Sequence, residues 1–470
     1  MRLRQMFRPR DMTEGVPWKG LLAFTVPMLI GNVAQQMYSV VDAIVVGHFV
    51  GDDALGAIGA TMPVFFLLLT LFIGISSGAG IMVSQYFGAK KREELSRTIG
   101  TCLSVTVIAA GVIMIFAPLG AGSLLRLLNV PDDMFAMSHM YINILLFGCV
   151  GFASYNILAG ILRGLGDSFT PVVYLVIATL VSAGLNVLFI GVFGWGVAGA
   201  AVSTVICQLL SGVLCFRRLL KMNDVFDIGK KYFIPMKKYV RQVSGLGLPT
   251  GASQAVFSVA MMALASLLNE FGEHYVTSNT IVMKIDGFVI MPIFSFGAAI
   301  MAFTGQNVGA KKLDRVKTGT RQCLIMSLVV ALVIVTAIMF FGIHLAGLFT
   351  ETQEIRETAL RILRILAPGY VMLALSTVFW SVIRGAGDTI TPMWVTFITV
   401  LIIRVPAAYF FVWVLRTNEA RGFEWLPTLA RFVIDPMNGI FYGTVVTWTL
   451  GTLASYLVYR FGKWRNRALV

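Results

Sequence analysis

The sequence predicts an all-α integral membrane protein with 12 transmembrane helices, arranged as two six-helix bundles. Composition, the number of long apolar runs and an internal repeat support this prediction. The chain has 470 residues, of which 57% are hydrophobic and 13% are charged, whereas a soluble domain carries about 25% charged residues. A chain so poor in charge cannot cover a water-exposed surface, so lipid is expected to surround most of it.

Twelve apolar stretches are long enough to cross a bilayer, because about 20 helical residues span its hydrocarbon core. The predicted spans are 20–47, 56–84, 98–119, 137–160, 170–192, 198–219, 248–269, 278–305, 322–348, 362–382, 391–414 and 439–461. The first run is too long for a secretory signal. We therefore expect a multi-pass protein of the cell membrane (inner or plasma membrane).

The basic residues predict the orientation of these spans. Of the 37 Lys and Arg residues, 28 fall in the terminal segments and in alternate connections. Loops rich in Lys and Arg stay in the cytoplasm, so both termini are expected to be cytoplasmic. The formal net charge of +14 then belongs to a face that meets anionic lipid, and nucleic acid is not an expected partner.

Two motifs recur with one spacing. The string "RGLGDSFTP" from Arg163 returns as "RGAGDTITP" from Arg384, 221 residues later, and "GAKK" returns at the same distance, from Gly88 to Gly309. One offset for two motifs indicates duplication of a six-span unit. Because six is even, both copies enter the membrane in the same direction, and an axis along the membrane normal should relate them as a parallel repeat. The predicted units are an N-terminal bundle (1–219), a basic cytoplasmic linker (220–241) and a C-terminal bundle (242–470).

The repeated "RGLGD" string is predicted to be a tight cytoplasmic turn with a structural role. Gly164 and Gly166 permit backbone angles that other residues avoid. Pro171 suits the first turn of the next helix. Arg163 and Asp167 are expected to cap that helix or to form an ion pair there.

Several strings identify a family resemblance. They are "PMLIGNVAQQMYSVVDAIVVGHFVG" in the first span, the two "GAKK" loops, "LRGLGDSFTP" with its copy, and "GVFGWGVAGAAVST" after the fifth span. By their order and spacing, the chain resembles the multidrug and toxic compound extrusion (MATE) family over essentially its whole length. The resemblance implies two bundles around a V-shaped cavity that opens alternately to the two membrane faces. It also implies antiport: export of organic, often cationic and aromatic small molecules in exchange for protons or sodium ions. No cofactor beyond the coupling ion and no protein partner are expected, and membrane lipids surround the chain.

Ionisable side chains inside a membrane are candidates for function, because each costs a few kcal/mol to place there. The predicted spans hold four of them: Asp42, Lys284, Asp286 and Arg404. Asp42 in the first span is predicted to exchange the coupling ion. Its buried carboxyl can take up a proton or, when ionised, bind sodium together with neutral oxygen ligands; the alternative is that it caps or pairs structurally near the outer end of its helix.

The family resemblance adds four polar residues to this cation-coupling site. Asn156, Ser182, Asn186 and Thr204 match polar positions of the family's first-lobe network. Some relatives carry an aspartate where this chain has Asn186, which cannot take up a proton, so Asp42 is the one acid expected there. For each of the four, an ordinary interhelical hydrogen bond is the alternative.

The second half carries Lys284 and Asp286 on the eighth span and Arg404 on the eleventh. Residues two apart do not share a helix face, so Asp286 is expected to face the cavity and bind a cationic substrate or a second coupling ion. Lys284 can extend to the outer interface, and a structural pair with Arg404 is the alternative role of Asp286. The predicted substrate-binding residues are Met37, Tyr38, Phe257, Lys284, Asp286 and Arg404.

Other function classes have less support. A lipid-linked saccharide flippase of the same superfamily should line its cavity with several cations for anionic headgroups, and only Lys284 and Arg404 qualify. An enzyme needs a catalytic cluster, but the four histidines are dispersed without metal-ligand spacing, and no phosphate loop or nucleophile motif is present. The five cysteines form no CxxC pattern and are expected to be reduced core residues. The sequence therefore predicts a carrier and not an enzyme.

Overall fold

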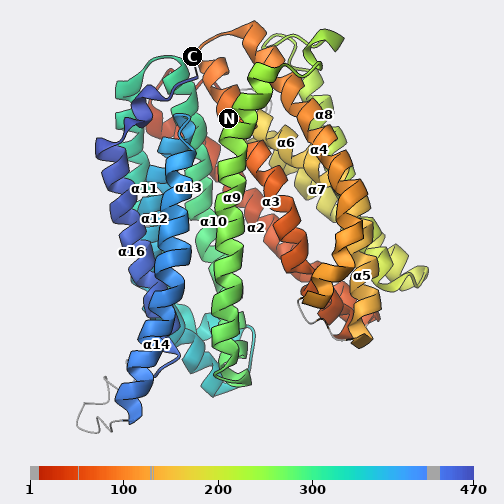
Figure 1. The fold of residues 1–470 in the computed structure, drawn as a ribbon, viewed down its shortest axis with the longest axis vertical. Helices are drawn as coiled ribbons and strands as arrows, with labels where there is room; N and C mark the ends of the chain where they lie inside the picture. The colour runs from red at the N-terminus through yellow and green to blue at the C-terminus, as the bar shows by residue number, and fades with distance from the viewer. Residues whose placement is uncertain (1–9, 51, 128–129, 131, 421–434, 470) are drawn as a thin grey trace.

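The computed structural model describes residues 10–50, 52–127, 130, 132–420 and 435–469, which contain helices and no strand (Figure 1). The N-terminal lobe comprises α2 (Pro17–Val50), α3 (Asp52–Gly88), α4 (Arg92–Leu127), α5 (Asp132–Phe147), α6 (Cys149–Gly164), α7 (Phe169–Asn186), the π-helix η1 (Val187–Val192) and α8 (Gly196–Leu220). The C-terminal lobe comprises α9 (Lys237–Asn269), α10 (Glu273–Gly309), α11 (Leu313–Gly347), α12 (Gln353–Gly385), α13 (Ile390–Thr396), the π-helix η3 (Phe397–Arg404), α14 (Val405–Ala420) and α16 (Asn438–Phe461).

These helices correspond to the predicted spans. Among the described residues, nine helices are long and apolar enough to cross a bilayer, and the bent pair α5–α6 makes a tenth. Helices α2 and α16 occupy the first and the last predicted span. The fourth span is not the single helix that the sequence predicted, because the chain bends by 50° between α5 and α6. Gly148 lies at the bend, where a Cβ would come within 2.2 Å of Val205, so the close approach of α8 requires glycine there.

The two lobes meet at one end and diverge at the other (Figure 1). Both ends of the chain lie at the end where the lobes meet. The helices cross there at glycines: a Cβ on Gly88 would lie 1.9 Å from the Gln306 carbonyl oxygen, and a Cβ on Gly309 would lie 2.0 Å from that of Gln85. Such small residues let helix backbones approach closely where no hydrophobic driving force acts between helices.

Two glutamines related by the repeat join the lobes at this end. Gln85 of α3 donates a hydrogen bond from Nε2 to the carbonyl oxygen of Gly385 at 2.9 Å. Gln306 of α10 donates in the same way to Gly164 at 3.1 Å. All four residues are buried, and the two halves of the arrangement are 221 residues apart. We call Gln85, Gln306, Gly164 and Gly385 the glutamine clasp.

The two ends of the chain complete the clasp. The Met12 backbone N–H donates to Gln306 Oε1, and the Leu469 N–H donates to Gln85 Oε1, each at 2.8 Å. Arg315 holds the first segment in place through the Met12, Glu14 and Gly15 carbonyl oxygens. Each glutamine amide therefore donates one hydrogen bond to the other lobe and accepts one from a terminal segment of the chain.

The repeated motifs form tight turns beside the clasp. Gly166 has φ +84° and its copy Gly387 has φ +101°, which few other residues adopt. Asp167 accepts hydrogen bonds from the backbone N–H and the hydroxyl of Thr170, at 3.0 and 2.7 Å, and so caps α7. Its ion pair is formed with Arg218 of α8 at 3.3 Å and not with Arg163, so the pairing expected from the motif alone is wrong.

The segment between the lobes folds back onto α4. Arg92 forms an ion pair with Asp227 at 2.8 Å and donates to the carbonyl oxygens of Asn223 and Asp224. Phe226 and Tyr232, the latter in the 3₁₀ turn η2 (Lys230–Tyr232), are buried against this surface. The basic segment is thus attached to the N-terminal lobe along its length.

The clasp makes a prediction about stability. Gln85→Ala and Gln306→Ala each leave a buried carbonyl and a buried N–H without a partner, at a cost of about 1–3 kcal/mol. We expect both to lower the melting temperature of the purified protein by a few degrees and by similar amounts. Gln353→Ala, which removes only an exposed 2.7 Å bond to Glu357, is the control and should change it little. An unchanged melting temperature in both clasp variants would contradict this account.

The linker makes a second prediction. The Arg92 guanidinium holds the pKa of Asp227 below its ordinary value of 3.8. The ion pair therefore holds the linker against α4 when the pH is above that value. The pair is lost as the pH falls through the lowered pKa of Asp227. At neutral pH, Asp227→Asn removes the same charge and should speed tryptic cleavage after Lys230 and Lys231. Asp224→Asn, whose carboxylate makes no hydrogen bond or ion pair among the described residues and acts on Arg92 only through its charge, is the control and should change the rate much less.

Candidate functional site

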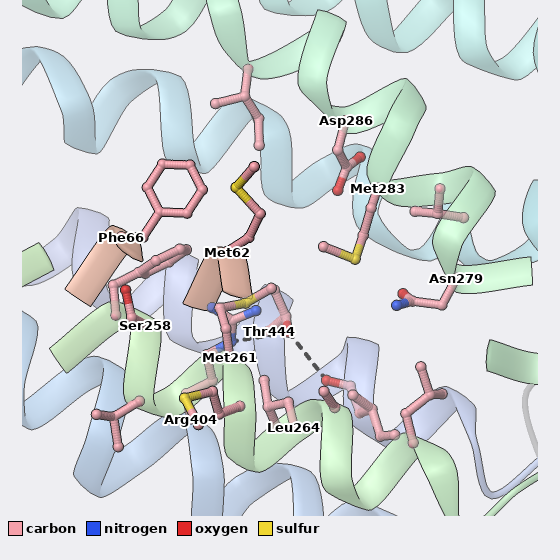
Figure 2. Close-up of a pocket in the computed structure, with 18 of the residues that line it drawn as sticks. Met62, Phe66, Ser258, Met261, Leu264, Asn279, Met283, Asp286, Arg404 and Thr444 are labelled. Carbon is pink, nitrogen blue, oxygen red and sulfur yellow. Dashed lines mark hydrogen bonds between the residues drawn. The ribbon is translucent and has the colours of Figure 1, made fainter. Parts of the chain in front are cut away.

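A cavity of about 650 Å³ lies between the lobes (Figure 2). The N-terminal lobe contributes Met62, Phe66 and neighbouring residues of α3, and the C-terminal lobe contributes residues of α9, α10, η3 and α16. Most of the lining is methionine, phenylalanine and aliphatic side chains. The polar lining residues are Ser258, Asn279, Asp286, Arg404 and Thr444.

Helix α10 supplies the acidic side of the cavity. Asn279, Met283, Asp286 and Ile290 line it, and their spacing of three or four residues places them on one face of the helix. Asp286 accepts a hydrogen bond from the hydroxyl of Tyr370 on α12. A carboxylate is thus held at the cavity wall, as the sequence predicted for Asp286.

Arg404 supplies the basic side of the cavity. It ends the π-helix η3 and is only 6% exposed. Its Nε donates to Thr444 Oγ1 at 3.2 Å, and its guanidinium lies 5.8 Å from the centre of the Phe257 ring. Among the ion pairs of the described residues, none joins Arg404 to Asp286. The direct structural pair weighed from the sequence is therefore not formed.

Of the other predicted substrate-binding residues, some line the cavity and some do not. Phe257 lines the cavity with Asp286 and Arg404. Lys284 and Met37 do not line it: the Lys284 ammonium lies 5.4 Å from the centre of the Phe349 ring, and Met37 is 55% exposed on α2. The side chain of Tyr38 lies outside the described residues. The sequence prediction missed Thr444 and Asn279, and it also missed Tyr370, the hydrogen-bond donor to Asp286.

Four of the five predicted cation-coupling residues, Asn156, Ser182, Asn186 and Thr204, lie within the N-terminal lobe and do not line this cavity. The side chain of Asp42 is outside the part of the chain that the structure describes. Asn186 accepts a hydrogen bond from the hydroxyl of Ser203 on α8. Asn156 and Thr204 donate within their own helices, to the carbonyl oxygens of Phe152 at 2.9 Å and Ala200 at 3.0 Å. Ser182 is fully buried.

No metal site accompanies these groups in the described part of the chain, where no three His, Cys, Asp or Glu side chains cluster. The five cysteines are all buried and form no disulfide, as the sequence predicted.

Comparison with known families identifies the chain. The MatE family profile matches residues 27–188 and again residues 249–410, which places one match in each lobe. The chain belongs to the MatE family. The duplicated match agrees with the repeat in the sequence, and members of this family are membrane transporters and not enzymes.

Individual MatE relatives are similar along most of the chain. The probable multidrug resistance protein YoeA of Bacillus subtilis (strain 168) is 29% identical over 399 residues, which cover 83% of this chain and 86% of YoeA. The probable multidrug resistance protein YpnP of the same strain is 27% identical and covers 98% of both chains. A crystal structure of MATE in complex with MaL6 superposes with a TM-score of 0.86 at 24% identity, covering 96% of this chain and 97% of that one.

The cavity geometry predicts different effects for two adjacent residues of α10. Met283 lines the cavity, whereas Lys284 points elsewhere. Met283→Gln places a polar group in an apolar wall and should weaken binding of a fluorescent aromatic cation by roughly threefold to tenfold, about 1 kcal/mol. Lys284→Gln should change the affinity by less than twofold. A larger effect of Lys284→Gln than of Met283→Gln, measured by fluorescence polarisation on purified protein, would contradict this placement.

Proposed function

We propose that this MatE transporter exports organic, often cationic and aromatic compounds by cation antiport, through alternating access of the cavity between its lobes. The observation that carries the proposal is an apolar cavity with a carboxylate in its wall, located between two lobes that diverge at one end. The names of the two Bacillus relatives, probable multidrug resistance proteins, support substrates of this kind.

The lining of the cavity suits varied aromatic ligands. Met62, Met261 and Met283 have flexible, polarisable side chains that adapt to different shapes, and Phe66 and Phe257 offer ring faces for stacking. Asp286 supplies one negative charge in a surrounding of low dielectric constant, where its attraction for a cation is strong. The cavity therefore accepts ligands of varied shape but favours those that carry a positive charge.

The glutamine clasp supports alternating access. The positively charged connections near the clasp support a cytoplasmic location for it, because loops rich in Lys and Arg stay in the cytoplasm. The described conformation is then closed to the cytoplasm and open outward. Opening to the cytoplasm requires both glutamine contacts and the close glycine crossings to separate, because they lie on the boundary between the lobes.

Coupling is assigned to Asp42 with the polar residues Asn156, Ser182, Asn186 and Thr204 of the first lobe. Protonation of Asp42 and occupancy by the drug exclude one another in this proposal, so one proton enters for each compound that leaves. A sodium ion at Asp42 is the alternative coupling ion. When a monovalent cation is exported in a one-for-one exchange, no net charge crosses the membrane, and the membrane potential of about 2.3 kcal/mol per 100 mV contributes nothing.

A lipid-linked saccharide flippase remains the less favoured function. Its anionic headgroup would need several cations in the cavity, and Arg404 is the one cation among the described lining residues. Lys284, which the sequence offered as a second cation, does not line the cavity.

The coupling assignment predicts the behaviour of Asp42→Asn. Asparagine cannot exchange a proton in the working pH range, so gradient-driven export from proteoliposomes should be abolished while the melting temperature and dye binding are retained. The exposed Asp314→Asn is the matched control and should export normally. Imposing pH and sodium gradients separately on the wild type identifies the coupling ion. Full gradient-driven export by Asp42→Asn would refute the assignment.

A further inference from the structure

The N-terminal lobe has a cavity of its own, of about 550 Å³. Helices α4 and α8 both pack against α6, and the cavity lies over α6 between them. Phe233 and Pro235 of the linker border one end of it. Its volume falls in the range of about 300–1,000 Å³ that is usual for small-molecule sites. None of its described lining residues also lines the cavity between the lobes. We call it the lateral cavity.

The lateral cavity is open toward lipid. Of the residues that line it, Val107 and Ile108 on α4 are each 59% exposed, and Val213 on α8 is 51% exposed. Ile157 and Leu158 on α6, behind them, are buried. Because α4 and α8 are both long and apolar enough to cross a bilayer, exposed side chains in their apolar stretches contact acyl chains and not water. The lateral cavity is therefore accessible to the membrane from the side.

The lining of the lateral cavity favours a hydrocarbon ligand. It contains no charged side chain among the described residues, and its hydroxyls belong to Ser104, Thr106 and Ser154. Ser104 donates to the Phe233 carbonyl oxygen at 2.5 Å, and Thr106 donates to that of Cys102 at 2.8 Å. A polar ligand would bury groups here with few partners, which costs free energy. An acyl chain has no polar group that needs a partner.

The linker is held in place where it borders the lateral cavity. A Cβ on Gly100 of α4 would lie 2.1 Å from the Tyr232 carbonyl oxygen, so this glycine permits the close approach of the linker. The Tyr232 hydroxyl donates to Glu93 at 2.8 Å, and the Arg97 guanidinium lies 5.6 Å from the centre of the Tyr232 ring. The linker end of the lateral cavity is therefore an ordered wall.

Exposed apolar and basic residues alternate along this part of the linker. Phe233, Ile234 and Met236 are exposed apolar residues. Lys231 and Lys237, on either side of them in the sequence, are exposed as well. Segments of this kind lie at the boundary between headgroups and acyl chains, where apolar side chains enter the bilayer and lysines extend toward the phosphates.

The charge of the linker favours an anionic headgroup. Residues 217–241 contain eight Lys or Arg and two Asp, and Asp227 is already paired with Arg92. Lys231 and Lys237 take part in no ion pair among the described residues. Clusters of basic residues next to a membrane span attract anionic lipids. An apolar cavity and free positive charge thus lie at the same end of the N-terminal lobe.

We propose that the lateral cavity binds an anionic phospholipid from the leaflet that borders the linker. One acyl chain of the lipid fills the cavity between α4 and α8, and its phosphate is bound by Lys231 and Lys237. The bound lipid then connects the linker to the helices of the N-terminal lobe. This inference goes beyond the export function and depends only on the location of the protein in a membrane.

The test uses two lipids that differ only in the headgroup. Dioleoylphosphatidylglycerol is anionic, and dioleoylphosphatidylcholine has the same acyl chains without net charge. Native mass spectrometry of the purified, delipidated full-length protein gives the affinity for the first bound molecule of each lipid. Val213→Trp places a large side chain at the opening of the lateral cavity. Lys231→Gln/Lys237→Gln removes two charges of the linker, and Lys311→Gln/Lys317→Gln, which removes two exposed lysines of the C-terminal lobe, is the matched control.

We expect the wild type to bind the first phosphatidylglycerol at least about fivefold more tightly than the first phosphatidylcholine. Lys231→Gln/Lys237→Gln should weaken phosphatidylglycerol by about fivefold or more and phosphatidylcholine by less than about twofold, because only the headgroup contact is lost. Val213→Trp should weaken phosphatidylglycerol by about tenfold, because the acyl chain is excluded. The control variant should change neither affinity by more than about twofold.

Four results would overturn the inference. The first is a wild type that binds both lipids equally or binds neither. The second is an unchanged affinity for phosphatidylglycerol in Val213→Trp, which would place the lipid elsewhere. The third is an equal loss in the control variant, which would reduce the effect to overall charge. The fourth is displacement of the bound lipid by a fluorescent aromatic cation, which would assign the lateral cavity to a second substrate molecule.

Melting temperatures show whether each variant is folded. If Val213→Trp does not fold, Val107→Trp on the facing wall of α4 blocks the same opening and takes its place. None of the four results contradicts the export function, which is tested separately by transport in proteoliposomes.

Discussion

The crossed hydrogen bonds of the glutamine clasp are the constraint on which the rest of the structure depends. Two long bundles with apolar surfaces gain little from packing against each other in lipid, because lipid tails are as apolar as their side chains. Contact between the lobes therefore relies on close backbone approach and on hydrogen bonds. At the clasp, Gln85 and Gln306 supply two of these bonds, and Gly88 and Gly309 permit the close approach. With the lobes joined at this end, their other ends diverge and the cavity lies between them.

In this arrangement, the charged residues of the cavity and the proposed ion-coupling residues belong to different lobes. The described charged residues of the cavity, Asp286 and Arg404, both belong to the C-terminal lobe, next to an apolar wall from α3. In the N-terminal lobe, Asn186 and Ser203 bond to one another inside the bundle. If Asp42 exchanges the coupling ion, ion and substrate bind to different lobes. They then communicate through the motion of one lobe against the other and need no shared site.

Much of the fold was predictable because the membrane imposes simple rules. Length and hydropathy gave the spans, and a shared offset of 221 residues gave the repeat. Asp286 and Phe257 were expected at the cavity from charge and helix position. Other features depend on contacts that a single sequence does not reveal. Gln85 and Gln306 are ordinary polar residues until the lobes are brought together. Asp167 was expected to cap the next helix or to pair with Arg163; it caps that helix, but its ion pair is with Arg218, which lies 51 residues away.

The remaining differences between the sequence predictions and the structure concern local backbone geometry. At the bend between α5 and α6, Gly148 lies against Val205, a residue that is distant in sequence. Arg404 reaches the cavity at the end of a π-helix, where the extra residue per turn shifts side chains from their α-helical positions. Lys284 was included in the predicted substrate site by its depth in the span, but its face of α10 turns it away from the cavity.

Access to the cavity from each membrane face tests the central claim most directly. Ser258 lines the cavity, and its side chain donates to the Gln254 carbonyl oxygen of its own helix. Ser258→Cys, in a background without the five native cysteines, is therefore a nearly isosteric probe for a membrane-impermeant maleimide. The account predicts rapid labelling from outside and protection from the cytoplasmic side, with the protection lost in Gln85→Ala/Gln306→Ala. Equal labelling from both sides while the clasp is intact would contradict it.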